Sequence, residues 1–430
     1  MRPTDATAQE RHMALFKRHI DAGVASGLIH VRIDDETLDP AFITVDGEKL
    51  VNFGSCAYLG LNMDPRLRAA ATKAVTGLGT VYSSSAVYTS VGLYTELEER
   101  LRKIIGAPVI VASTTTIAHL GALPSLVGEG DAVLVDNSAH ASLHLASRVL
   151  ASEGIPILPV MHNDMADLER QLSELSERHR HVWYLGDGVY SMFGDVAPVS
   201  GLRGLLDAYP NFYLYIDDAH GFGWKRKHGR GWILSGMPWH PRMVLAFSLA
   251  KSWGSGGAAL AFPDEETAMR VRAVGGTFTF SGPLHPAELG AGIAVADIHL
   301  SQEHVERQTE FIRQIDLVSK SLRAARLPVV SYDQTPLWFV TVGTFSRALE
   351  LCQRLKGRGF FTNLASFPAV PLHQSGIRFT NTLNHSDDQI LELVGHLGEL
   401  VPEIAGETQI EIDLTELETA QPAPEIQETV

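Results

Sequence analysis

The sequence has little cysteine, since only Cys56 and Cys352 occur in 430 residues. These two residues provide neither a disulfide framework nor the paired spacing of a zinc site, so we expect two free thiols in a reducing cytosol. Apolar runs of the roughly 18 residues that span a bilayer are also missing, as is an apolar signal-peptide core at the N-terminus. We therefore expect a soluble, cytoplasmic protein that does not insert into membranes.

Basic residues are scarce as well, with 35 Lys and Arg against 50 Asp and Glu and a formal net charge of −15. Nonspecific nucleic-acid binding needs a basic surface, so we expect no nucleic-acid partner. Beyond Glu403 the chain has several acidic residues and no Lys or Arg. We interpret this end as a solvated, partly disordered tail, with docking to a partner or neighbouring subunit as the alternative.

Alternating apolar strands and helices predict an α/β fold, and the 45% hydrophobic content is enough for a large core. We expect an N-terminal arm with an amphipathic helix (residues 1–64) and a large domain with parallel strands (65–284). A smaller α+β domain (285–402) and the acidic tail (403–430) should follow. The helix expected at 9–25 is of the kind that packs on a dimer partner.

Lys251 stands between an apolar strand and a glycine-rich turn, in the run 247–257 (FSLAKSWGSGG). An amine withdrawn from water loses solvation of its charged form, and the neutral amine is the form that attacks an aldehyde. Lys251 therefore has the setting of a Schiff-base lysine. An exposed lysine at a strand end is the simpler explanation of this run alone, so other residues must support the assignment.

Two further strands end in polar residues. The stretch 211–221 (NFYLYIDDAHG) predicts a buried strand that ends at Asp217 and is followed by His220, and the strand 131–135 leads to His140. Ligands collect at the carboxyl edge of such sheets, so Lys251, Asp217 and His140 can face one pocket. Taken singly, a histidine is commonly structural, and paired aspartates at a strand end commonly form a turn or helix cap.

Together these groups fit pyridoxal 5′-phosphate (PLP). A carboxylate beside the pyridine nitrogen keeps it protonated and makes the ring an electron sink, while a flat imidazole can cover the ring face. Phosphate donors follow the strand 109–112, where the run 113–116 (STTT) opens a helix. Free amides and hydroxyls at a helix start suit a dianion, and simple N-capping is a compatible explanation of the same residues.

The order of these motifs from about Asn52 to Leu400 resembles the α-oxoamine synthase family of fold type I PLP enzymes. The landmarks are Tyr58-Leu59-Gly60-Leu61, Leu97-Glu98, Gly121-Ala122-Leu123, His140-Ala141-Ser142, His162-Asn163-Asp164, 187–192 (DGVYSM), 217–220 (DDAH), 248–251 (SLAK), 368–371 (PAVP) and Ile377-Arg378-Phe379. The resemblance implies a large domain with a mostly parallel seven-stranded sheet, a small C-terminal α+β domain and an obligate homodimer. It also implies decarboxylative condensation of an α-amino acid with an acyl thioester, giving an α-aminoketone, CO2 and free thiol.

The resemblance also implies roles for single residues. Lys251 would hold PLP and remove the Cα proton, Asp217 would pair with the pyridine nitrogen, and His220 would bond the ring's phenolic oxygen. His140 would stack on the ring, while Arg378 would clamp the amino-acid carboxylate and thereby orient the bond that breaks. Further cofactor contacts would be Thr115, Thr116, Ser191, Ser248 and Ser281, the last in the segment 275–282 that reaches the partner's cofactor phosphate.

Several positions depart from the family pattern and bear on the substrate. Cys56 stands where an amide often lies near the amino acid, and Ala369 replaces a threonine found in some members. The other departures are Thr115-Thr116 for a Gly-aromatic pair, a serine-rich stretch at 82–87 for a glycine-rich one, Phe193 for an acid, and Gly282 for a hydroxyl residue. They favour specialised metabolism, with an unusual amino acid or an acyl donor bound to a carrier protein.

Two alternatives stay open from the sequence. The first is another PLP enzyme of the same fold, such as an aminotransferase or a lyase, although aminotransferases commonly stack an aromatic ring where this chain has His140. The second is a noncatalytic partner subunit. Such a subunit is expected to lose the Schiff-base lysine, whereas Lys251, Asp217, His220 and His140 are all present.

Overall fold

The computed structural model describes residues 8–406, which divide into two compact units. The large unit comprises residues 57–191 and 195–311, and the small unit comprises 8–56, 192–194 and 312–406. This division differs from the boundaries expected above. Residues 285–311 belong to the large unit because α11 (Pro286–His299) packs on α2 (Pro65–Leu78) and α3 (Leu93–Ile105). The segment up to residue 56 belongs to the small unit rather than to a separate arm.

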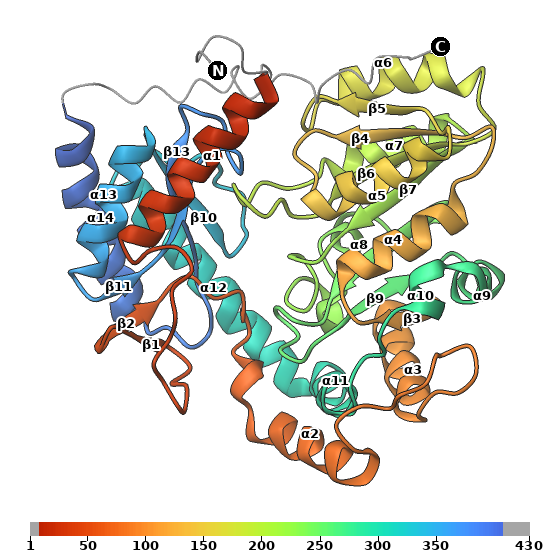
Figure 1. Cartoon of the computed structure of the whole chain (residues 1–430), viewed down its shortest axis with the longest axis horizontal. Helices are drawn as coiled ribbons and strands as arrows, with labels where there is room; N and C mark the ends of the chain where they lie inside the picture. Colours follow the sequence, from red (N-terminus) through yellow and green to blue (C-terminus); the bar gives the residue numbers. More distant parts are fainter. Residues whose placement is uncertain (1–7, 407–430) are drawn as a thin grey trace. The chain divides into compact units, whose positions relative to one another are not determined.

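A seven-stranded sheet forms the centre of the large unit, with strand order β3-β9-β8-β7-β6-β4-β5 (Figure 1). Its strands are β3 (Val109–Ala112), β4 (Ala132–Asp136), β5 (Ile157–Val160), β6 (Val182–Asp187), β7 (Phe212–Asp217), β8 (Met243–Ser248) and β9 (Ala258–Ala261). Strand β9 pairs antiparallel with β3 and β8, and the remaining neighbours pair parallel. The predicted mostly parallel seven-stranded sheet of an α/β fold is confirmed.

Helices follow the strands of this sheet in the alternating order that the sequence predicts. They are α4 (Thr115–Leu126), α5 (Ala141–Ser152), α6 (Met165–Ser176), α7 (Val199–Ala208), α8 (Ile233–Gly236), α9 (Glu265–Val274) and α10 (Gly276–Phe280), with short 3-10 turns η1 (Leu61–Met63) and η2 (Lys227–Gly229). Apolar side chains of α4, α5 and α9 pack on one face of the sheet in a single core cluster. Burial of this apolar surface holds α4 and α5 against the strand ends that carry the polar residues.

The small unit contains two three-stranded sheets, ordered β10-β13-β12 and β1-β2-β11. Its elements are α1 (Ala8–Ala25), β1 (Phe42–Val45), β2 (Glu48–Asn52), β10 (Leu337–Gly343), α13 (Phe345–Lys356), β11 (Phe360–Phe361), β12 (Asn363–Ala365), β13 (Ser375–Thr380) and α14 (Asp387–Ala405). Helix α12 (Gln302–Ala324) begins in the large unit and ends in the small one. Helix α1 packs on its own unit, since the His19 ring stacks on Phe345 at a centroid distance of 4.0 Å.

Phe193 belongs to the hydrophobic core of the small unit. Its ring meets Phe339 edge-on at a centroid distance of 5.0 Å and packs with Ala365 and Val370. The position therefore serves packing rather than substrate chemistry.

Between residues 8 and 406, no helix is both long enough and apolar enough to cross a membrane. The predicted acidic tail lies outside the described residues from 407 onward.

Candidate functional site

A small cavity lies at the carboxyl edge of the seven-stranded sheet. It is lined by Thr115, His140, Asp187, Val189, Asp217, Ala219, His220 and Lys251. Asp187 and Asp217 are the last residues of β6 and β7, and Lys251 follows β8 after two residues. The structure thus brings together Lys251, Asp217, His140 and His220 as the sequence predicts, because parallel strands end at one edge.

The loop after β8 holds Lys251 in a fixed position. Its backbone carbonyl accepts a hydrogen bond from the Gly254 N–H at 3.0 Å, and the fully buried Trp253 anchors the loop. Gly254 has φ = +77°, and a Cβ there would approach the Asn62 nitrogen to 2.7 Å. Only glycine fits this position, so the glycine-rich run after Lys251 shapes the loop that carries the amine.

Asp217 is a buried carboxylate with a hydrogen-bond donor on each oxygen. Its Oδ1 accepts the Ala219 N–H at 3.0 Å, and its Oδ2 lies 3.0 Å from Nε2 of His119. Burial works to raise the pKa of Asp217, but the hydrogen bond from His119 and the charge of Lys251 outweigh it and lower the pKa. Asp217 is therefore suited to be an anion in this cavity.

His119 is a site residue that the sequence analysis missed. It lies on α4, is fully buried, and places Nδ1 at 2.9 Å from the hydroxyl of Tyr215. Its signal in the sequence was a polar residue inside the apolar stretch 117–123 (IAHLGAL). A polar side chain buried in such a helix needs a hydrogen-bond partner, here on β7.

Asp187 is a second residue of the cavity to which no role was assigned from the sequence. Its Oδ1 accepts the backbone N–H of His140 at 3.1 Å. Burial, together with the charge of Asp217, raises the pKa of Asp187 well above its usual range. Asp187 is therefore suited to be neutral, whereas its neighbour Asp217 is suited to be charged.

His140 caps the N-terminus of α5 and lies in the cavity as a neutral ring. Its Nδ1 is 2.6 Å from the Ser142 hydroxyl and accepts the Ser142 N–H at 3.3 Å. Burial, with a contribution from the charge of Lys251, lowers the pKa of His140. The contacts with Ser142 orient a flat, uncharged ring, which suits stacking on a planar cofactor.

His220 is held by a residue from a distant part of the sequence. Its Nδ1 lies 2.7 Å from the hydroxyl of Tyr58, and its backbone carbonyl accepts the Trp224 Nε1–H at 2.7 Å. Tyr58 begins the motif 58–61 (YLGL), and the sequence alone did not predict its contact with His220. The contact with Tyr58 fixes the orientation of the His220 ring in the lining of the cavity.

The start of α4 supplies hydroxyl and amide groups at the cavity. Thr114 is the N-cap, with its side chain accepting the Ile117 N–H at 3.2 Å, and Thr115 lines the cavity. Thr116 is in the same first turn, outside the lining residues. Ser248 ends β8 with its Oγ accepting the Ala250 N–H at 3.2 Å, and Ser191 is half-buried. Of the cofactor contacts predicted at Thr115, Thr116, Ser191 and Ser248, Thr115 is the one in the lining.

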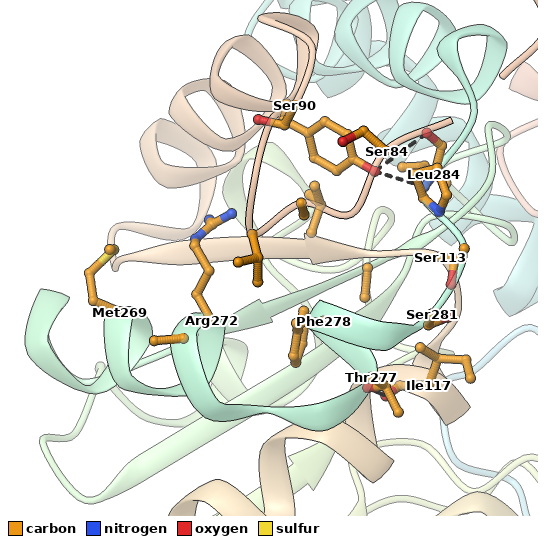
Figure 2. A pocket seen from close by; sticks show the side chains of 18 residues that line it. Ser84, Ser90, Ser113, Ile117, Met269, Arg272, Thr277, Phe278, Ser281 and Leu284 are labelled. Carbon is orange, nitrogen blue, oxygen red and sulfur yellow. Dashed lines mark hydrogen bonds between the residues drawn. The ribbon is translucent and has the colours of Figure 1, made fainter. Parts of the chain in front are cut away.

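Ser281 lies elsewhere in the large unit, in a cavity of about 350 Å³. Figure 2 shows Ser281 there with Ser84, Ser113 and Thr277, among apolar side chains. This cavity is the larger one, but it lacks the amine, carboxylates and imidazoles that converge around Lys251. We therefore place the candidate chemistry in the smaller cavity.

The residues predicted to bind substrate belong to the small unit. Arg378 lies on β13, is 9% exposed, and has its Nη2 3.7 Å from the Sγ of Cys56. Ala369 is exposed in the segment between β12 and β13. Cys56 and Arg378 thus lie together, whereas Ala369 is at the surface of the same unit.

Comparison with known proteins gives the family. The pattern of the aminotransferase class I and II family matches residues 48–397. The chain is 34% identical to 8-amino-7-oxononanoate synthase of Maricaulis maris, over 82% of this chain and 87% of that protein. It is 30% identical to serine palmitoyltransferase of Bacteriovorax stolpii, over 83% of each. The structure of Sphingomonas wittichii serine palmitoyltransferase matches with a TM-score of 0.83 at 23% identity, over 93% of this chain and 99% of that one.

The chain therefore belongs to the aminotransferase class I and II family, and within it to the α-oxoamine synthases. It is a PLP-dependent C-acyltransferase that condenses an amino acid with an acyl thioester. The residues around Lys251 fit PLP, since they offer an amine for its aldehyde, an anionic carboxylate for its ring nitrogen and a helix start for its phosphate.

Proposed function

We propose that the cavity around Lys251 is the active site of this α-oxoamine synthase. The observation that carries the proposal is the convergence of Lys251, Asp217, His140 and His220 on one cavity, from the ends of β7 and β8 and the start of α5. A Schiff-base amine and a carboxylate for the ring nitrogen are groups that PLP chemistry uses, and the two imidazoles can contact the ring.

When bound, PLP supplies an electron-withdrawing ring that lets the amino-acid Cα carry negative charge. Lys251 would bind the aldehyde carbon through Nζ and would later take the Cα proton. Asp217 would hold a proton at the ring nitrogen, and His220 would hydrogen-bond the phenolic oxygen. His140 would lie on the ring face, where its neutral ring excludes water.

The overall reaction that we assign balances without a redox partner. A bond forms between Cα and the thioester carbonyl carbon, while the carbon–sulfur bond breaks and the thiol leaves. The amino-acid carboxylate leaves as CO2, and a proton returns to Cα to give the α-aminoketone. Arg378 is proposed to bind the amino-acid carboxylate through its planar guanidinium, beside Cys56.

We also propose that the active form is a homodimer. The large unit exposes large apolar side chains from the segment 80–90 and from α9 and α10, including Tyr88 at 83% and Phe280 at 90% exposure. Monomeric proteins rarely expose such clusters, and a second copy of the chain would cover them. We expect Tyr88→Asp with Phe280→Asp to yield monomers in light scattering, whereas a dimer at wild-type affinity would contradict this surface.

The identity of the acyl carrier and the amino acid is tested by one assay. Purified protein with PLP is given single amino acids and then acyl-CoA or acyl carrier protein donors, with thiol release as the readout. We expect thiol, CO2 and a ketone from one pair, and none of them from Lys251→Ala. A keto acid formed from the amino acid without thiol would instead establish an aminotransferase, and PLP binding without any product would indicate a noncatalytic subunit. A cytoplasmic location and a role in specialised metabolism stay predictions.

A further inference from the structure

Two carboxyl groups stand side by side at the edge of the sheet. Asp187 ends β6 and Asp217 ends β7, and the two residues are partners in the parallel register. Both side chains line the cavity and both residues are almost fully buried. Neighbouring strands lie roughly 5 Å apart, and two carboxylates at partnered positions on them repel each other when both are charged. One member of the pair is therefore expected to hold a proton.

The hydrogen bonds to the two carboxyl groups are unequal. Asp187 accepts one backbone N–H, from His140. Asp217 accepts a backbone N–H on Oδ1 and faces the ring of His119 with Oδ2 at 3.0 Å. Donors stabilise the charged form of a carboxyl group, so the extra donor from His119 favours the anion at Asp217. The opposite pKa directions of Asp187 and Asp217 agree with this difference.

Asp217 and Tyr215 together fix which nitrogen of His119 carries the hydrogen. A carboxylate only accepts hydrogen bonds, so Nε2 of His119 must donate to Asp217. Nδ1 of the neutral ring is then an acceptor for the Tyr215 hydroxyl at 2.9 Å. Tyr215 and Asp217 are two residues apart on β7 and share one face of the strand, where α4 delivers His119. Burial and the charge of Asp217 raise the pKa of Tyr215 well above its usual range, which keeps the hydroxyl protonated.

We propose that His119 is a positioning residue which, held by Tyr215, makes Asp217 the charged carboxylate of the pair and so keeps a proton on the pyridine nitrogen of bound PLP. The inference rests on the proposed site at Lys251 and adds a residue to it. A purely structural His119 would fill space between α4 and β7 and would leave the protonation of the cofactor unchanged.

The test uses the holoenzyme with PLP labelled with ¹⁵N in its ring, because the ¹⁵N chemical shift reports whether that nitrogen is protonated. Its pH dependence is measured in wild type, His119→Leu, His119→Gln and Tyr215→Phe. We expect the protonated signal to be lost at pH 8 in His119→Leu. His119→Gln should keep the protonated signal, since the glutamine amide can donate to Asp217. Tyr215→Phe should lose the proton on the ring nitrogen at a lower pH than wild type.

Two carboxamide variants serve as controls. Asp217→Asn should abolish the protonated signal, whereas Asp187→Asn should leave it unchanged because Asp187 is already neutral. Wild-type pH profiles in both His119→Leu and Tyr215→Phe would overturn the proposal. If His119→Leu does not retain PLP, Tyr215→Phe decides alone, since it removes only a hydroxyl, and a wild-type profile there overturns the proposal.

The ¹⁵N readout is independent of acyl transfer. A His119-dependent signal in a protein that releases no thiol with any donor would contradict the assigned reaction and support the role of His119. Thiol release together with a ¹⁵N signal that does not change in the His119 variants would support the assigned reaction and contradict the role of His119. The two proposals can therefore fail separately.

Discussion

The hydroxyl of Tyr58 lies 2.7 Å from Nδ1 of His220, and both side chains are buried. The two residues are 162 positions apart in the chain, so the contact forms only when the large unit folds. It joins the segment that precedes α2 to the segment that follows β7. This contact, together with the position of His220 three residues after Asp217, orients the imidazole ring.

We expect Tyr58→Phe to weaken both folding and cofactor binding. The change removes one buried hydrogen bond and leaves Nδ1 of His220 without that partner, which should cost about 1–3 kcal/mol of unfolding free energy. Urea unfolding and a PLP titration measure the two effects. Tyr82→Phe, which removes a hydroxyl 3.2 Å from the exposed Thr89, is the matched control and should lie within about 0.5 kcal/mol of wild type. Equal stabilities of Tyr58→Phe and wild type would contradict the assignment.

His162 links two carboxylates of the large unit, with Nδ1 2.8 Å from Asp136 at the end of β4 and Nε2 2.6 Å from Asp195. Burial alone would lower the pKa of His162, but the two carboxylates outweigh it and raise the pKa to about 10. Because the folded pKa lies above the unfolded value of 6.5, the stabilisation is fully present below pH 6.5 and is lost as the pH rises through about 10.

The stability difference between wild type and His162→Gln should therefore be largest near pH 6, at a few kcal/mol, and should shrink toward pH 10. Unfolding in urea at a series of pH values measures it. His373→Gln, at an exposed position, is the control variant. A difference that stays constant between pH 6 and 10 would show that His162 is not held as a cation.

His304 should make the fold sensitive to acid. It is fully buried, stacks on His299 at a centroid distance of 4.3 Å, and burial lowers its pKa to about 4. Because the folded pKa lies below the unfolded value of 6.5, stability is lost as the pH falls from 6.5 to about 4. We expect His304→Leu to reduce this loss by about 2–3 kcal/mol, measured as the unfolding free energy at pH 7.5 and pH 4.5. Identical acid losses in the two proteins would refute the prediction.

Arg378→Lys should raise the KM for the amino acid on the order of tenfold or more, because lysine cannot form the bidentate pair with a carboxylate. The preference of wild type for an amino acid over its amide should shrink in the variant, since the amide lacks the carboxylate. Arg354→Lys, on an arginine that pairs with Glu403 at the surface, is the control. An unchanged preference in Arg378→Lys would remove Arg378 from the substrate site.

The sequence predicted the parts of the site that follow from strand ends. Lys251, Asp217 and His140 each follow an apolar strand, and parallel strands bring their ends together, so local patterns were enough. The role of His119 could not be predicted, because its partners Tyr215 and Asp217 lie 96 and 98 residues away in the sequence. The apolar sequence of its helix indicates only a core position. Phe193 likewise departs from the family pattern because it packs on Phe339, a contact that no local pattern predicts.

Lys251 should carry the cofactor and thereby enable acyl transfer. The decisive experiment records the visible absorbance of wild type and Lys251→Ala with PLP, followed by thiol release on addition of an amino acid and acyl thioesters. We expect a lysine-dependent absorbance band and thiol release in wild type, with both absent from Lys251→Ala. The same band in Lys251→Ala, or no thiol from wild type with any amino acid and acyl donor, would contradict this role of Lys251.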